Sequence, residues 1–189
     1  MNKKKIYIVT GGFSGIGLSI CDNLLHNNHQ VVSIGKTPKK LLNLKKKFKK
    51  YIKNFDPIIC NLENENEIKD LKMYLNKKYT KIDGLVNNAG INPSRNNILR
   101  TSLSDWNKTL NVNLTGVFLI TKHIISNLKN NSSIVNISSV AAKGMKNRIS
   151  YSTSKAGLIG FTKSLAIDFA KRKIRVNCLL PGYVKIQFF

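Results

Sequence analysis

The sequence predicts an α/β fold in which helices cover both faces of a doubly wound parallel sheet. The first observation is that short apolar runs rich in Ile and Val alternate with longer segments of helical period, and strands that alternate with helices form parallel sheets. The second is that the runs are almost continuously apolar, as is typical of strands covered on both faces. The length of 189 residues is that of one domain, so we expect residues 1–189 to form a single domain.

The first half of the chain supplies four of the expected strands. Each strand is a short apolar run that ends in or near Gly, Pro or Asn, and each intervening segment repeats its apolar residues at helical spacing. In the segment 38–53 the lysines fill the face opposite the apolar residues, which we interpret as a solvated helix face. In order, the expected elements are strand 5–11 (KIYIVTG), helix 16–27, strand 30–35 (QVVSIG), helix 38–53, strand 57–61 (PIICN), helix 65–79 and strand 82–87 (IDGLVN).

The second half repeats the alternation with longer helices. A helix is expected at 105–129, followed by strand 133–138 (SIVNIS), a helix at 150–172 and strand 174–180 (IRVNCLL). Each helical segment is long enough for the right-handed crossover that a parallel sheet requires. We therefore expect six parallel strands.

Composition excludes several classes of protein. Hydrophobic residues make up 42% of the chain and charged residues 22%, unlike a disordered chain. The longest apolar runs are too short for a membrane span, and the basic, glycine-interrupted start is unlike a signal peptide. Cys21, Cys60 and Cys178 are scattered, which favours neither a disulfide framework nor a metal site. We expect a cytoplasmic protein with no metal and no membrane partner.

The formal charge of +23 raises the question of nucleic-acid binding. Lysine nevertheless supplies most of the excess: 27 of the 32 basic residues are Lys, and Arg, which reads bases bidentately, is scarce. Lys, Asn and Ile all have A/T-rich codons, so genome composition accounts for much of the charge. The aromatics within the lysine run, Phe48 and Tyr51, belong to the apolar face of the expected helix, so the lysine face lacks the stacking platform that single-stranded nucleic acid requires. We therefore expect no specific nucleic-acid partner, with binding through the lysine face as the least favoured hypothesis.

A glycine turn follows the first expected strand. The segment 10–17 reads TGGFSGIG, and a helical pattern begins near Ile16. Glycines permit a tight turn and the close approach of backbone to a pyrophosphate, whose charge is met by free N–H groups at the helix N-terminus. This arrangement predicts dinucleotide binding in a Rossmann fold.

A second motif places a phenol and an amine together. Tyr151 and Lys155 lie four residues apart at the start of an expected helix, so their side chains share one face. An ammonium group beside a phenol favours the phenolate, which suits the phenol to proton transfer near neutral pH.

These motifs occur in order with several others. They are TGGFSGIG at 10–17, NNAG at 87–90, Asn113 in NVNLTGVF, Ser138 and Ser139 at the end of IVNISS, YSTSK at 151–155, and Pro181 with Gly182. Together they resemble the short-chain dehydrogenase/reductase family over essentially the whole chain. The segments NNAGI, SYSTSKAGLIGFTKSLA and IRVNCLLPGYV are similar to β-ketoacyl-acyl-carrier-protein reductases, which act in fatty acid biosynthesis.

The resemblance implies a catalytic set. Tyr151 would be the acid/base that protonates a carbonyl oxygen as hydride arrives from nicotinamide, and Lys155 would assist it and bind the nicotinamide ribose. Asn113 would support a bound water behind Lys155. Matching by the preceding apolar run assigns the substrate-orienting serine to Ser139, but Ser138 stays open because the segment from Ser139 to Tyr151 is one residue shorter than the family pattern.

The resemblance also implies cofactor contacts along the carboxyl ends of the strands. Asn61 stands where the family usually has Asp, so a contact with adenine would lack charge. The implied cofactor residues are Gly11, Ser14, Gly15, Ile16 and Gly17 at the pyrophosphate, Asn61 and Leu62 at the adenine, Asn88, Ala89 and Gly90 along the ribose, Tyr151 and Lys155 at the nicotinamide end, and Pro181, Gly182 and Val184 behind the nicotinamide ring.

The end of the second expected strand predicts NADP in preference to NAD. A carboxylate there would accept from the 2′-hydroxyl of NAD, whereas a cation would accommodate the 2′-phosphate of NADP. The segment 33–40 reads SIGKTPKK and contains no acid. Lys36 is the expected phosphate contact, with Lys39 or Lys40 as further candidates.

The chain departs from the family pattern after Pro181-Gly182. Family members continue through substrate-covering helices and a seventh strand, and Ile186 stands where a threonine usually contacts the cofactor. We expect a truncated form or fragment with weak turnover, an unprotected sheet edge and a tendency to aggregate, and a full-length form that is a homo-oligomer. The expected substrate is a small-molecule or acyl-carrier-bound carbonyl compound; a sugar or polyol dehydrogenase and a non-catalytic dinucleotide-binding protein are the alternatives.

Overall fold

The structure is a computed structural model that describes residues 3–93 and 96–184. Within these residues, six strands form one parallel sheet in the order β3-β2-β1-β4-β5-β6. This order reverses between β1 and β4, as in doubly wound dinucleotide-binding folds, and it confirms the predicted fold class. The strands are β1 (Ile6–Thr10), β2 (Gln30–Gly35), β3 (Phe55–Ile59), β4 (Ile82–Asn87), β5 (Leu128–Ile137) and β6 (Arg175–Leu179).

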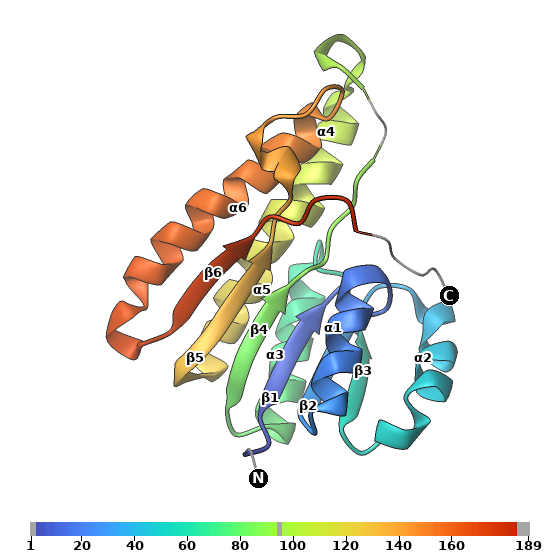
Figure 1. Cartoon of the computed structure of the whole chain (residues 1–189), viewed down its shortest axis with the longest axis vertical. Coiled ribbons are helices and arrows are strands. Elements are labelled where there is room, and N and C mark those ends of the chain that lie inside the picture. The colour runs from blue at the N-terminus through green and yellow to red at the C-terminus, as the bar shows by residue number, and fades with distance from the viewer. Residues whose placement is uncertain (1–2, 94–95, 185–189) are drawn as a thin grey trace.

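Helices pack on both faces of the sheet, and all six strands end at the same edge (Figure 1). One apolar cluster joins the first two helices to β1, β2 and β3, and includes Val9, Leu25 and Phe48. The other lies across the opposite face and includes Ile68, Leu85 and Ile120. The helices are α1 (Gly15–His26), α2 (Leu41–Lys47), α3 (Glu65–Lys78), α4 (Leu103–Leu110), α5 (Gly116–Ile124) and α6 (Ile149–Asp168).

The predicted helix 38–53 was wrong as a continuous element. A short 3₁₀ turn at Pro38–Lys40 precedes α2, and a second at Lys49–Tyr51 follows it. The lysines of this segment recur at i, i+4 spacing, where like charges destabilise a helix. Burial of Phe48, whose ring lies 4.6 Å from that of Phe55, fixes the chain after α2 instead.

The predicted helix 105–129 was also interrupted. Residues 103–110 form α4, Asn111–Thr115 form a π-helical segment, and α5 ends at Ile124. The strand β5 then begins at Leu128, five residues before the predicted start. A tertiary contact explains the early end: Arg172 donates to the carbonyl oxygens of Ile125 and Leu128 and so satisfies backbone that a longer helix would have used.

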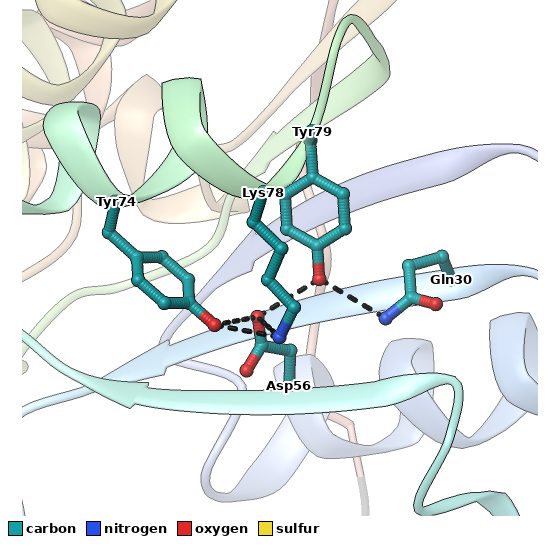
Figure 2. A network of polar contacts seen from close by, with 5 residues as sticks. All are labelled: Gln30, Asp56, Tyr74, Lys78 and Tyr79. Carbon is teal, nitrogen blue, oxygen red and sulfur yellow. Dashed lines mark hydrogen bonds and ion pairs between the residues drawn. The ribbon is translucent and has the colours of Figure 1, made fainter.

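A network of polar side chains lies at the end of the sheet where the strands begin, opposite their carboxyl ends. Figure 2 shows that the side chains of Tyr74, Lys78 and Tyr79, at the end of α3, point toward Asp56 of β3. One Asp56 carboxylate oxygen accepts hydrogen bonds from both phenols and from the Lys78 ammonium, at 2.8–2.9 Å. Gln30 of β2 donates to the Tyr79 hydroxyl at 3.2 Å. The network fastens α3 to two neighbouring strands.

Among the described residues, none of the helices combines the length and apolar character that a membrane crossing requires.

Candidate active site

The turn between β1 and α1 has a backbone that demands glycine. Gly11 has φ +64° and Gly15 has φ +55°, in the left-handed region. A Cβ at Gly17 would lie 2.4 Å from the Gly11 carbonyl oxygen, so the first turn of α1 packs directly on the preceding loop. Ser14 precedes the helix with extended backbone and makes no side-chain cap hydrogen bond. The turn is therefore a cradle of backbone and small side chains at a helix N-terminus.

Asn88 joins this turn to the loop after β4. The Thr10 hydroxyl oxygen accepts from the backbone N–H groups of Asn88 and Ala89, both at 3.0 Å. The Asn88 amide donates to the carbonyl oxygens of Thr10 and Gly11 at 3.0 and 3.3 Å. The motifs at 10–17 and 87–90 thus form one rigid unit where the strand order reverses.

A cavity of about 200 Å³ opens beside this unit. Lys36 lies at its wall with its ammonium 3.3 Å from a carboxylate oxygen of Glu63. Lys40 also lines the cavity, whereas Lys39 lies outside its lining. The predicted cofactor residues that line it are Gly11, Ser14, Lys36, Asn61, Leu62, Ala89 and Gly90.

Asn61 is held in a tight turn at the far side of this cavity. Its side-chain oxygen accepts from the Glu63 N–H at 3.3 Å, and its backbone N–H donates to Glu67 at 2.7 Å. Asn64 caps α3 through the backbone N–H groups of residues 66 and 67. This segment is therefore fixed between β3 and α3.

A second cavity, of about 180 Å³, shares the wall residues Gly90 and Ile91 with the first. It brings together side chains that lie far apart in the sequence. The predicted site residues at this cavity are Ile16, Asn88, Gly90, Ser139, Tyr151, Lys155, Pro181 and Gly182, and the alternative serine Ser138 also lines it.

Lys155 is a buried cation, 4% exposed. Burial lowers its pKa from the ordinary 10.5 to about 8. Its ammonium donates to the Ile137 carbonyl oxygen at 2.8 Å and lies 5.8 Å from the centre of the Tyr151 ring. The site thus holds a charged amine beside the phenol at a desolvation cost, which is characteristic of functional positions.

The two candidate serines differ in what their hydroxyl groups do. Ser138 is buried and donates to the Lys155 backbone oxygen at 2.7 Å. Ser139 accepts from the Ala141 N–H at 3.2 Å and lines two cavities together with Tyr151. Ser139 therefore lines the same two cavities as Tyr151, whereas the Ser138 hydroxyl fixes α6 to the end of β5.

Asn113 lies in the π-helical segment, with no exposed surface. Its side chain accepts from the Ile91 N–H at 2.7 Å and donates to the Ile91 carbonyl oxygen at 2.9 Å and to Ser154 at 3.1 Å. A Cβ at Gly90 would lie within 3.3 Å of both Asn113 and Lys155 side-chain atoms. Asn113 is thus adjacent to Lys155 and fixes the loop after β4.

A third cavity, of about 440 Å³, adjoins the phenol. Arg148 donates to the Asn92 side chain at 2.6 Å and to the Pro93 carbonyl oxygen at 2.8 Å, which holds the loop after β4 against the start of α6. The lining includes Asn92, Ser139, Met145, Lys146, Arg148, Tyr151, Gly182 and Tyr183. Its position next to Tyr151 suits a substrate.

Some predicted residues do not line a cavity, and some lining residues were missed. Gly15 and Gly17 shape the turn, and Val184 is half exposed outside the cavity linings given above. Ile186 lies outside the described residues. Sequence reasoning missed Phe13, Thr37, Cys60, Glu63, Ile91, Asn92, Val112 and Arg148, for which a position next to a recognised motif was the available signal.

The arrangement suits proton transfer next to a dinucleotide. The glycine cradle, the amide-lined cavity and the Lys36 ammonium match a pyrophosphate, an adenine and a phosphate in chemistry. Within residues 3–93 and 96–184, no group of three His, Cys, Asp or Glu side chains could hold a metal ion. The fit to an organic dinucleotide rests on the glycine turn, Asn61 and Lys36 beside the first cavity.

Comparison with known proteins agrees with this geometry. The family model "short chain dehydrogenase" matches residues 5–189. The chain is 36% identical to the 3-oxoacyl-[acyl-carrier-protein] reductase FabG of Thermotoga maritima over 185 residues, which cover 96% of this chain and 74% of that protein.

Two solved structures are similar throughout. The structure "ElxO with NADP Bound" is 30% identical with a TM-score of 0.91, covering 98% of this chain and 76% of that one. An actinorhodin polyketide ketoreductase variant with NADPH is 32% identical with a TM-score of 0.89, covering 97% of this chain and 72% of that one. With the fold, the glycine turn and the Tyr151–Lys155 pair in place, these matches show that the chain belongs to the short-chain dehydrogenase/reductase family of oxidoreductases.

Proposed function

We propose that the chain is an NADPH-dependent reductase of 3-oxoacyl thioesters carried on acyl carrier protein. The observation that carries the proposal is that Ser139, Tyr151 and Lys155 line one cavity, which shares Gly90 with the cavity beside the glycine turn. A dinucleotide that extends from the cavity beside the glycine turn into the cavity at Tyr151 would place its nicotinamide end next to the phenol. The relatives named as 3-oxoacyl-[acyl-carrier-protein] reductases support the choice of substrate.

The residues divide the binding of the dinucleotide among them. Gly11 and Ser14 would hold the pyrophosphate at the start of α1, where Gly17 permits the close packing of the helix on the turn, and Asn61 and Leu62 would hold the adenine. The loop of Asn88 and Ala89 would run along the ribose, and Pro181 and Gly182 would lie behind the nicotinamide ring. When bound, the cofactor supplies the hydride that reduces the carbonyl carbon.

The chain's own groups supply the proton and the orientation. Ser139 donates a hydrogen bond to the substrate carbonyl oxygen, and the Tyr151 hydroxyl transfers its proton to that oxygen, so the carbonyl becomes an alcohol. The Lys155 ammonium stabilises the phenolate left behind, and Asn113 fixes the backbone at Ile91 behind it. Hydride and proton together balance the reduction.

The preference for NADP rests on charge. Lys36 and Lys40 line the cavity at the end of β2, where NAD-binding proteins of this fold carry an acid. The similar structures bound to NADP or NADPH support the same cofactor. We expect kcat/KM to be higher with NADPH than with NADH, and Lys36→Asp to reverse the order; preference of the wild type for NADH would contradict this part of the proposal.

We further propose a cytoplasmic location, an acidic carrier partner and an oligomeric assembly for the enzyme. All three cysteines are free thiols, as is usual in a reducing cytoplasm. A basic enzyme suits an acidic carrier protein. We propose residues 1–189 as one dinucleotide-binding domain, and a homo-oligomeric assembly of the enzyme.

A matched pair of variants tests the assignment of roles. Tyr151→Phe should lower kcat by at least about 100-fold, as expected for loss of a general acid, with NADPH affinity retained. Ser139→Ala should lower kcat strongly while its lost bond to the Ala141 N–H costs only about 1 kcal/mol of stability, whereas Ser138→Ala should cost about the same stability through its own lost hydrogen bond and change kcat much less. A wild type that binds NADPH but never oxidises it with a 3-oxoacyl thioester would instead be a non-catalytic binding protein.

A further inference from the structure

Glu63 occupies an unexpected place in this cavity. The chain has nine acidic residues against 32 basic ones. Among the described residues that line the cavity, Glu63 is the sole carboxylate, and Lys36 and Lys40 are the cations. Its carboxylate lies 3.3 Å from the Lys36 ammonium, with 28% of the Glu63 side chain exposed. The cation expected to meet a 2′-phosphate is therefore already paired.

The backbone at Glu63 is held in place. Its N–H donates to the Asn61 side chain at 3.3 Å, and the Asn64 N–H donates to the Asn61 carbonyl oxygen at 3.0 Å. The Cys60 N–H in turn donates to the Gly35 carbonyl oxygen at 3.0 Å, which fixes this segment beside the end of β2. The backbone that carries the Glu63 carboxylate is therefore anchored beside the end of β2, next to Lys36.

At this position the Glu63 carboxylate disfavours binding of the 2′-phosphate that the Lys36 ammonium attracts. A 2′-phosphate carries a charge of about −1.5 to −2 near neutral pH, so it competes with Glu63 for the ammonium and is repelled by the carboxylate. A 2′-hydroxyl meets the opposite situation, because a carboxylate accepts its hydrogen bond. We propose that Glu63 is a specificity-determining residue that weakens discrimination in favour of NADP over NAD. This inference rests on the proposed dinucleotide site.

Binding of the oxidised nucleotides tests the inference without turnover. The Kd values of NADP⁺ and NAD⁺ are measured by calorimetry for the wild type, Glu63→Gln and Glu65→Gln. In Glu63→Gln the ratio of the NAD⁺ Kd to the NADP⁺ Kd should rise about two- to fivefold, the scale of one partly exposed charge interaction. At about 1 M salt, where the Debye length is about 3 Å, the rise should shrink.

Glu65→Gln is the matched control. It removes the same charge two residues away, but Glu65 pairs with His123 of α5 at 2.8 Å and lies outside the cavity lining. Its ratio should equal that of the wild type. Lys36→Gln should move the ratio in the opposite direction from Glu63→Gln, because it removes the cation that attracts the phosphate.

The outcomes separate this inference from the proposed function. A Glu63→Gln ratio that stays unchanged or falls, in a protein that still binds both nucleotides, would overturn the role of Glu63 and leave the proposed function standing. An equal rise in Glu65→Gln would also overturn it, because the effect would then be one of net charge. A wild type that binds neither nucleotide would overturn both proposals.

Discussion

The buried ammonium of Lys155 predicts an unusual dependence of stability on pH. Lys155→Met keeps an unbranched side chain but removes the charge. Because burial lowers the Lys155 pKa in the folded protein from 10.5 to about 8, the unfolded chain binds more protons at this residue between those values. The contribution of Lys155 to the free energy of unfolding therefore rises with pH across this interval. Below the interval, the full free-energy cost of burying the ammonium is present.

The magnitude follows from the width of the interval. From about 8 to 10.5, at about 1.36 kcal/mol per pH unit, the full change is about 3 kcal/mol. By about pH 9.5, which is accessible in urea unfolding, about 2 kcal/mol of it should be present. The measured quantity is the difference in free energy of unfolding between wild type and Lys155→Met, because other titrating groups cancel in that difference.

A second lysine of α6 provides the control. Lys163 is exposed on the same helix, so Lys163→Met removes a charge from α6 without relieving a buried cation, and its difference from wild type should be flat. The Lys155→Met difference should instead shift in favour of the wild type as pH rises. A flat profile for Lys155→Met would refute the conclusion that the site holds a desolvated ammonium.

The remaining predictions concern the turn, the network at the opposite edge and the support of Lys155. Gly17→Ala should abolish dinucleotide binding in calorimetry, since its Cβ would lie 2.4 Å from backbone, whereas Gly160→Ala, where a Cβ meets nothing within 4 Å, should bind normally. Asp56→Asn should cost about 1–3 kcal/mol in urea unfolding with unchanged nucleotide affinity; a large loss of affinity would show that the two edges are coupled. Asn113→Ala should lower both stability, by about 1–3 kcal/mol, and kcat, and a wild-type kcat would exclude its support of the site.

The fold and the main site could be predicted because their signals are local. Strands buried on both faces leave continuous apolar runs, and the turn of Gly11 and Gly17 needs residues that tolerate a left-handed backbone or a close approach. Parallel strands place their carboxyl ends together, so motifs after β1, β4 and β5 had to converge. The spacing of Tyr151 and Lys155 is itself a local distance on one helix.

The rest depends on contacts between distant residues. The early end of α5 reflects hydrogen bonds from Arg172, which lies more than 40 residues later in the chain. The π-helical segment around Asn113 accompanies its paired bonds to Ile91. Glu63 follows a recognised position, yet its pairing with Lys36 arises from the juxtaposition of β2 and β3. Such interactions leave no periodic or motif signal.

Transfer of isotopic label tests the central claim most directly. NADPH carrying deuterium at the transferable position of the nicotinamide is incubated with the protein and a 3-oxobutyryl thioester, and the product is analysed by mass spectrometry. The account predicts a 3-hydroxybutyryl thioester with deuterium at C3 from the wild type, and a yield at least about 100-fold lower from Tyr151→Phe. Product without deuterium at C3, or an equal yield from Tyr151→Phe, would contradict it.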